Sequence, residues 1–129
     1  MAIISDQSVR ANMLSSIIEK SFDHISEVPV LQTNKLDSIK KLKDPLLLLI
    51  DLMSMGKTSR EIIVPVRKID RDIKIIALHL YRSSTLVNPL FEMGVNGYMY
   101  YEPSRDELKK AIHTVMSERK YIPEYITPW

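Results

Sequence analysis

The fold is decided by Leu46-Leu47-Leu48-Leu49-Ile50-Asp51, a run of five apolar residues that ends in an aspartate. Apolar and polar side chains do not alternate along this run, which is typical of a strand covered on both faces. A strand of this kind belongs to a parallel sheet that lies between two layers of helices. We therefore expect the aspartate to lie at the carboxyl edge of such a sheet, where ligands bind in α/β proteins.

Strands and helices are predicted to alternate along the rest of the chain. Short apolar runs are followed by segments in which apolar residues recur three and four positions apart. Gly94 stands where the C-terminal cap of a helix belongs, and Ser104 and Glu107 have the spacing of a capping box. Further strands are expected at 2–5, 28–31, 73–78 and 95–101. Helices are expected around 13–18, 33–42, 59–69, 86–91 and 104–116.

These alternations, with their short connections, predict an α/β, flavodoxin-like (βα)5 three-layer sandwich. Its parallel five-stranded sheet is expected to have the order 2-1-3-4-5. Pro65 and Pro89 fall inside predicted helices, so each helix either is kinked or begins later than its apolar pattern indicates. The 129 residues fit one domain, placed at 1–120. Residues 121–129 include two prolines and are expected to form a C-terminal tail or the start of a linker.

The composition excludes several classes of function. The chain has no cysteine, which excludes disulfides, thiolate metal sites and cysteine nucleophiles. A net charge of +2 is too small to argue for nucleic-acid binding, and no segment reads as a helix-turn-helix. No apolar run approaches the ~18 residues of a membrane span, and the N-terminus does not read as a signal peptide, so a cytoplasmic protein is expected. Three glycines and no glycine-rich phosphate loop leave a small flavodoxin-like enzyme as a remote alternative.

Polar side chains follow the predicted strands at the edge where ligands bind. Asp6 follows the first strand, Asp51 the third and His79 the fourth, and Tyr100 and Tyr101 end the fifth. Two carboxylates that face one crevice can hold a hard divalent cation such as Mg²⁺. Beside such a cation, one carboxylate can attack a phosphoryl group and form an aspartyl-phosphate. The alternative for Asp51 is that it is an ordinary polar residue at the end of a strand.

Three segments resemble the receiver domain of response regulators in two-component signalling. The segment 44–53 is similar to the strand that carries the phosphoacceptor aspartate in that family. The segment 94–101 is similar to the fifth strand, most of all in the LuxR-type transcription-factor branch. Residues 104–108 resemble the usual start of the last helix, and the resemblance extends over about residues 2–122.

The resemblance implies roles for the residues at the strand ends. Asp51 matches the phosphoacceptor, and Asp6 matches the second of two adjacent acids, the one that usually contacts the metal. Ser5 stands in place of the first acid. Met53 matches the position whose backbone carbonyl is usually a metal ligand. The implied cofactor is Mg²⁺, expected to bind weakly or not at all.

Two positions depart from the family pattern. His79 replaces the hydroxyl residue that donates to the phosphoryl group, and Tyr101 replaces the lysine that pairs with the phosphoryl oxygens. A phenol supplies one neutral donor where an ammonium supplies a full charge, and charge-assisted bonds are roughly twice as strong. A protonated His79 would restore some charge, and the alternative is a simple polar residue at a strand end. Tyr98 matches the aromatic residue that turns inward on activation, or else it only covers the core.

The sequence therefore predicts an atypical receiver domain that works mainly as a protein-interaction module rather than as an enzyme. Its phosphoryl switch is expected to be weakened or absent. The expected partner is a histidine kinase or another signalling protein, and a homodimer would use the fourth helix, the fifth strand and the fifth helix. The alternative is a working phosphoacceptor at Asp51 that controls a transcriptional output.

Overall fold

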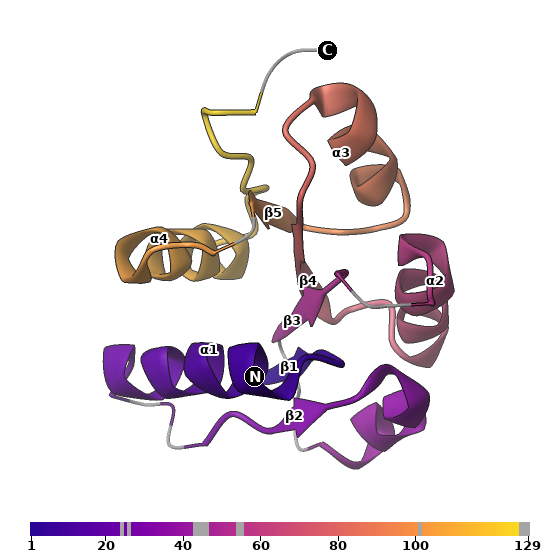
Figure 1. The fold of residues 1–129 in the computed structure, drawn as a ribbon, viewed down its shortest axis with the longest axis vertical. Helices are drawn as coiled ribbons and strands as arrows, with labels where there is room; N and C mark the ends of the chain where they lie inside the picture. Colours follow the sequence, from indigo (N-terminus) through magenta and orange to yellow (C-terminus); the bar gives the residue numbers. More distant parts are fainter. Residues whose placement is uncertain (24, 26, 43–46, 54–55, 101, 127–129) are drawn as a thin grey trace.

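Five parallel strands form the central sheet of the computed structural model, and helices cover both of its faces (Figure 1). The structure describes all residues except 24, 26, 43–46, 54–55, 101 and 127–129. The strands follow the order β2-β1-β3-β4-β5, so the predicted order 2-1-3-4-5 of a flavodoxin-like sheet is confirmed. The strands are β1 (Ala2–Ile4), β2 (Val30–Leu31), β3 (Leu47–Asp51), β4 (Lys74–His79) and β5 (Gly97–Tyr100).

Two helical layers lie against the sheet. The helices α1 and α4 cover one face, and η1, α2 and α3 cover the other (Figure 1). Among the described residues, no helix has both the length and the apolar character needed to cross a membrane. The helical segments are α1 (Ser8–Ser21), η1 (Thr33–Lys41), α2 (Ser59–Ile69), α3 (Ser84–Glu92) and α4 (Arg105–Met116).

One helical segment differs from the sequence expectation, and two helices exclude one of the alternatives that it left open. The second helical segment, η1, is a 3₁₀ helix in which Lys35 (φ −126°, ψ 33°) leaves the helical region. This conformation interrupts the regular helix that the spacing of apolar residues predicts. Helices α2 and α3 begin at Ser59 and Ser84 and run through Pro65 and Pro89, so neither helix begins after its proline.

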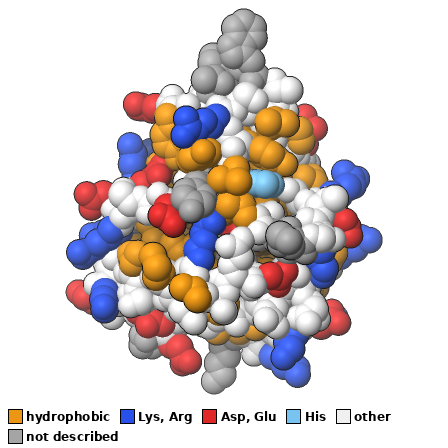
Figure 2. Space-filling view, viewed as in Figure 1, with side chains coloured by type: hydrophobic (Ala, Val, Ile, Leu, Met, Phe, Trp, Pro, Cys, Tyr) orange, Lys and Arg blue, Asp and Glu red, His pale blue; other side chains and the backbone are white. Residues whose placement is uncertain are grey.

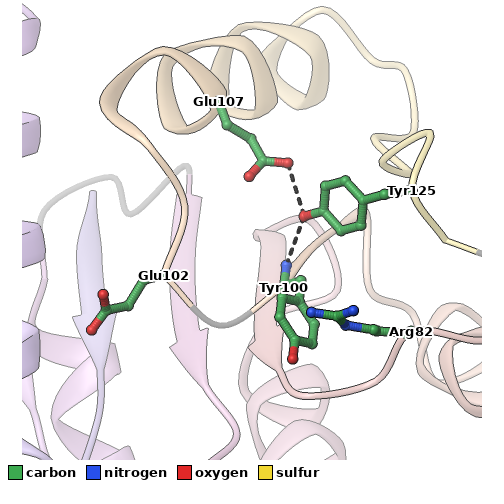
Figure 3. A pocket seen from close by; sticks show the side chains of 5 residues that line it. All are labelled: Arg82, Tyr100, Glu102, Glu107 and Tyr125. Carbon is green, nitrogen blue, oxygen red and sulfur yellow. Dashed lines mark hydrogen bonds between the residues drawn. The ribbon is translucent and has the colours of Figure 1, made fainter.

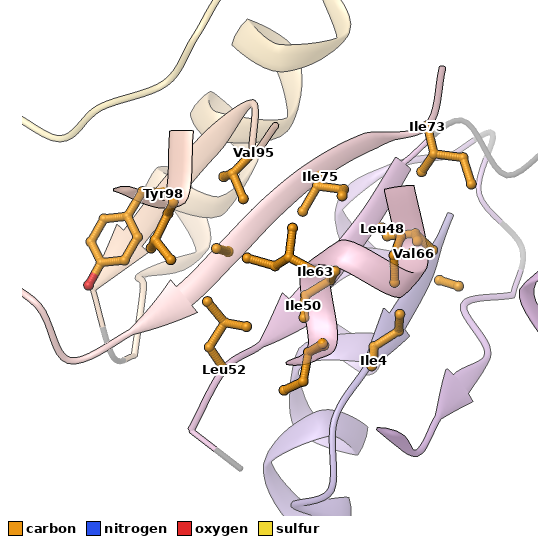
Figure 4. Packing of buried hydrophobic residues seen from close by; sticks show 14 of the residues in the cluster. Ile4, Leu48, Ile50, Leu52, Ile63, Val66, Ile73, Ile75, Val95 and Tyr98 are labelled. Atoms are coloured by element: carbon orange, nitrogen blue, oxygen red, sulfur yellow. The ribbon is translucent and has the colours of Figure 1, made fainter. Parts of the chain in front are cut away.

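Residues of β3 contribute to two hydrophobic clusters, one on each face of the sheet. Leu48 and Ile50 face the layer of α2 and α3, where they pack in one cluster with Val66 (Figure 4). Leu47 and Leu49 belong to the opposite cluster, which includes residues of α1 and α4. All residues of β3 are buried. A sheet covered on both faces thus explains why the run has no alternation.

The C-terminal segment, residues 121–126, packs along the outer edge of β5. Tyr121 is buried and pairs with Gly97 in a parallel bridge. The N–H of Tyr98 donates to the carbonyl of Tyr121 (2.9 Å), and the N–H of Tyr121 donates to the carbonyl of Asn96 (3.1 Å). A Cβ atom at Gly97 would lie 2.9 Å from Cγ2 of Val115, so the glycine permits the close packing of α4 on β5, whereas the Cβ of Tyr121 would be at an ordinary contact distance of 3.4 Å. The domain boundary at residue 120 stays a prediction, but residues 121–126 lie against the sheet.

Candidate functional site

Asp51 is the buried carboxylate at the carboxyl end of β3, with 2% of the residue exposed. The hydroxyl of Ser5 donates to Oδ2 of Asp51 over 2.9 Å, and the backbone N–H of Met53 donates to Oδ1 over 3.0 Å. Ser5 follows β1 directly and is itself only 1% exposed. These neutral donors hold the carboxylate between the ends of β1 and β3.

Asp6 is exposed, and two hydrogen bonds join it to the start of η1. Its carboxylate oxygens accept from the backbone N–H of Thr33 (2.8 Å) and from the Thr33 hydroxyl (2.6 Å). Successive side chains of an extended chain point in opposite directions, and Ser5 is the one that reaches Asp51. The role of Asp6 as a metal contact stays a prediction.

Gln7 is a residue of this site that the sequence analysis did not single out. Its side-chain amide Nε2 donates to the backbone carbonyl of Met53 over 2.6 Å. Its backbone N–H donates to the hydroxyl oxygen of Ser5 over 3.0 Å. No local sequence motif predicts this contact, because Gln7 and Met53 lie 46 positions apart in the chain.

The hydrogen bonds to the Asp51 carboxylate and to the Met53 carbonyl do not fit a bound Mg²⁺ ion. Mg²⁺ takes oxygen ligands in a near-octahedral arrangement, usually with several waters. The carbonyl of Met53, one expected ligand, already accepts a hydrogen from Gln7, and the carboxylate of Asp51 accepts hydrogens from Ser5 and Met53. Within the part of the chain that the structure describes, no three His, Cys, Asp or Glu side chains gather as a metal site.

His79 ends β4 as a half-buried, neutral side chain. Its Nδ1 accepts a hydrogen bond from the N–H of Leu80 (2.8 Å), which places the proton of the neutral ring on Nε2. The ring stacks on Tyr81 with 4.0 Å between ring centroids. Burial lowers the pKa of His79, and the charge of Asp51 acts against this shift. At neutral pH the imidazole therefore does not supply the positive charge that a protonated His79 would. Tyr101, the other departing position, lies outside the described residues.

Tyr98 points inward and is fully buried in the core (Figure 4). Its hydroxyl donates to the carbonyl of Tyr81 over 2.7 Å and accepts from the N–H of Tyr81 over 2.8 Å. Burial raises the pKa of the Tyr98 phenol, which keeps the hydroxyl protonated as a donor. The side chain of Tyr98 therefore links the β4–α3 connection to β5 through two hydrogen bonds. Whether Tyr98 serves as a switch stays a prediction.

Response regulators are among the solved structures that are similar to this chain. The LuxR-family two-component response regulator from Aurantimonas sp. SI85-9A1 has a TM-score of 0.83 and 18% identity, over 97% of this chain and 89% of that chain. The receiver domain of the stress response regulator RcsB from Escherichia coli has a TM-score of 0.72 and 20% identity, over 95% and 96% of the two chains. The chain has the receiver fold.

The likeness concerns the fold, since the identities are low. The LuxR-family DNA-binding response regulator from Silicibacter pomeroyi has a TM-score of 0.71 and 13% identity, over 95% of each chain. The receiver fold also spans 62% of the longer RcsB chain from Salmonella typhimurium, which matches with a TM-score of 0.71 and 19% identity over 97% of this chain. The sequence itself matches no protein-family model and no curated protein at a significant level.

A second cluster of polar groups lies between β5, α4 and the C-terminal segment (Figure 3). The hydroxyl of Tyr125 accepts from the N–H of Tyr100 (3.1 Å) and donates to Oε2 of Glu107 (3.0 Å). The hydroxyl of Tyr121 donates to the same oxygen (3.0 Å). Glu107 thus joins two tyrosines of the C-terminal segment to α4, and Ser104 caps the helix through the N–H of Glu107 (3.1 Å).

This cluster borders a pocket of about 320 Å³. The guanidinium of Arg82 lies 4.5 Å from the ring centroid of Tyr100, in a cation–π contact at one wall. The rings of Tyr100 and Tyr125 meet edge to face with centroids 6.3 Å apart. The pocket is lined by Arg82, Tyr100, Glu102, Glu107 and Tyr125.

The buried phenols predict a loss of stability at alkaline pH. Burial raises the pKa of Tyr125 from 10.0 to about 12, and it raises the pKa values of Tyr98 and Tyr121 as well. A raised folded-state pKa contributes stability that is present below the unfolded value of 10.0 and is lost as the pH rises toward 12. The free energy of unfolding is measured by denaturant unfolding at a series of pH values, and tyrosinate absorbance is followed in parallel. Tyr125→Phe should make the decline shallower, and a free energy of unfolding that stays constant from pH 10 to 12 would contradict the prediction.

Proposed function

We propose that the chain is a signal-transduction module of the receiver fold that acts through protein contacts, with weak or absent phosphoryl-switch chemistry. The observation that carries the proposal is the inward position of Tyr98, held by the backbone N–H and carbonyl of Tyr81. In the receiver family, the aromatic residue at this position turns inward on activation. Here both of its hydrogen bonds come from the backbone, so the inward position needs no phosphoryl group.

The surroundings of Asp51 support the same proposal. A phosphoryl group carries a charge of about −1.5 to −2 at neutral pH and is best stabilised by cationic donors. Ser5 and Met53 offer Asp51 a hydroxyl and an N–H, both neutral, and His79 is uncharged at neutral pH. A neutral donor offers the anion a hydrogen bond without the full positive charge that a lysine ammonium would add. An aspartyl-phosphate at this site would therefore be held weakly.

The surface formed by α3, β5, α4 and the C-terminal segment is the proposed contact face. Leu86 on α3 and Ile122 and Tyr125 on the C-terminal segment each leave about half of their surface exposed. Figure 2 shows hydrophobic side chains gathered near the middle of one face of the molecule, with most charged side chains around its rim. A histidine kinase, another signalling protein or a second copy of the chain is the proposed partner, in a cytoplasmic pathway without direct nucleic-acid contact by this chain.

The test is phosphorylation by a small phosphodonor. The protein is incubated with the donor and Mg²⁺, and its intact mass is followed over time. We expect slow, substoichiometric addition or none, because the two described residues that donate hydrogen bonds to Asp51, Ser5 and Met53, do so through neutral groups. Prompt and stoichiometric addition of one phosphoryl group would reject the proposal.

A working phosphoacceptor is the alternative, and the position of Asp51 favours it. The carboxylate lies at the carboxyl end of β3, where the resemblance places the acceptor. If the chain is labelled, Asp51→Asn should abolish the labelling, whereas Asp37→Asn, on η1, should leave it intact. Labelling that persists in the Asp51→Asn protein would rule out this assignment.

A further inference from the structure

We infer that the amide of Gln7 and the hydroxyl of Ser5 take the structural place of a divalent cation at the carboxyl ends of β1 and β3. This inference deepens the proposed function and rests on it. In a receiver with two adjacent acids, a cation would join the carboxylates to the carbonyl of the β3–α2 connection. In this chain, neutral donors of the chain itself make the equivalent links.

The hydrogen bonds form one continuous path between the two strand ends. The backbone N–H of Gln7 donates to Ser5 Oγ (3.0 Å), and the Ser5 hydroxyl donates its single proton to Oδ2 of Asp51 (2.9 Å). On the other side, the N–H of Met53 donates to Oδ1 of Asp51 (3.0 Å). The side-chain amide of Gln7 then donates to the Met53 carbonyl (2.6 Å), which closes the path.

Every polar atom on this path has a partner of the correct kind. Ser5 donates to Asp51 and, over 3.5 Å, to the carbonyl of Gln7, it accepts from the N–H of Gln7, and both carboxylate oxygens of Asp51 accept. Ser5 and Asp51 are buried, and buried polar groups are costly when they are left unpaired, so their pairing stabilises the site without added charge. A cation would have to compete with the N–H₂ group of Gln7 for the carbonyl of Met53. The pattern therefore favours exclusion of Mg²⁺.

The decisive measurement is a Mg²⁺ titration of the wild-type chain, followed through the backbone amide resonances of Ser5, Gln7 and Met53. We expect no saturable shift of these resonances. The matched variant carries Ser5→Asp and Gln7→Ala, which adds a carboxylate beside Asp51 and removes the donor at the Met53 carbonyl. This variant should bind Mg²⁺ saturably, and its melting temperature should rise with Mg²⁺ because a ligand that binds only the folded state stabilises it.

A control variant separates the effect of the added carboxylate on Mg²⁺ binding from the effect of losing the hydrogen bonds. Ser5→Ala combined with Gln7→Ala removes the same donors and adds no carboxylate. Its melting temperature should not respond to Mg²⁺, because Asp6 accepts hydrogen bonds from Thr33 and no second carboxylate stands beside Asp51. If this control gains Mg²⁺ binding as strongly as the Ser5→Asp, Gln7→Ala protein, the added carboxylate is not the cause and the inference is wrong.

A second pair of variants tests Gln7 as a positioning residue. Gln7→Leu removes the donor, and Gln7→Lys keeps a donor that can reach the Met53 carbonyl. Hydrogen exchange at the amide of Met53 reports the link, since this N–H is bound to Asp51. We expect faster exchange in the Gln7→Leu protein and near wild-type exchange in the Gln7→Lys protein. Equal exchange in both would overturn the role of Gln7.

The inference and the proposed function can fail separately. Saturable shifts at Ser5, Gln7 and Met53 in the wild-type titration would overturn the inference, whether or not the variants fold. Labelling by the phosphodonor, measured both with Mg²⁺ and with a chelator, decides the proposed function. A chain that binds Mg²⁺ and remains unlabelled would leave the interaction module intact and remove only the role assigned to Ser5 and Gln7.

Discussion

Replacing Arg67 with methionine is expected to lower the free energy of unfolding by about 3 kcal/mol, because a partly buried cluster of oxygens loses its shared donor. The guanidinium of Arg67, near the end of α2, donates to the carbonyls of Gly94 and Ile73 and to Oδ1 of Asn96 (3.0 Å). The same Asn96 oxygen also accepts from the N–H of Ile75 (2.8 Å). Arg67 thus joins the α2–β4 connection to the α3–β5 turn. Equilibrium denaturation measures the change.

Arg67→Lys is the matched control for this prediction. A lysine keeps the positive charge, but its compact ammonium cannot span the separated acceptors as the planar guanidinium does. We expect a loss of stability between those of the wild type and the methionine variant. Equal stability of the lysine variant and the wild type would show that charge, and not the geometry of the donors, carries the effect.

Gly94 gives an independent check on the position of Arg67. Gly94 has φ +104°, and a Cβ atom there would lie 2.7 Å from Nε of Arg67. Gly94→Ala should therefore cost both backbone strain and a clash in the wild-type background. In the Arg67→Met background only the strain of about 1 kcal/mol should remain. An equal cost in the two backgrounds would place Arg67 elsewhere.

The sequence predicted the fold well because its strongest signals are local. The unbroken apolar run ahead of Asp51 requires cover on both faces, and the structure supplies it. Gly94 has the positive φ that its place after α3 implies. The capping box expected at Ser104 is only half made, since the carboxylate of Glu107 accepts from tyrosines of the C-terminal segment. A complete capping box at Thr58 and Glu61 opens α2 and was visible in the sequence as the same spacing.

The candidate site could be predicted only in part. Asp51 follows from its place at the end of an apolar run. The bonds from Ser5 to Asp51 and from Gln7 to Met53 each join positions 46 apart, and which side chain after β1 turns inward depends on how that strand ends. The resemblance favoured Asp6 as the metal contact, whereas the structure joins Asp6 to Thr33 and brings Ser5 to Asp51. Long-range hydrogen bonds of this kind leave no periodic pattern in a sequence.

Removing the hydroxyl of Tyr98 is the second change with a large expected effect. Tyr98→Phe should lower the free energy of unfolding by about 2 kcal/mol, because the N–H and carbonyl of Tyr81 lose their shared partner. The ring itself is fully buried and keeps its packing, so the fold should persist. Denaturant unfolding gives the global effect, and hydrogen exchange at the amide of Tyr81 gives the local one. Tyr100→Phe, on the same strand, is the matched control and should leave the Tyr81 amide protected.

Hydrogen exchange at the Tyr81 amide distinguishes two explanations for the inward position of the Tyr98 ring. If hydrogen bonds to Tyr81 hold the β4–α3 connection against β5, its amide should exchange much faster in the Tyr98→Phe protein, and the stacked ring of His79 should gain freedom with it. If packing alone fixes Tyr98, the exchange rate at Tyr81 should not change although stability falls. Only the first outcome agrees with the proposal that hydrogen bonds to the Tyr81 backbone, and not phosphorylation of Asp51, determine the conformation of the contact face. In that case the contact surface of α3, β5 and α4 has one resting conformation that the chain maintains by itself.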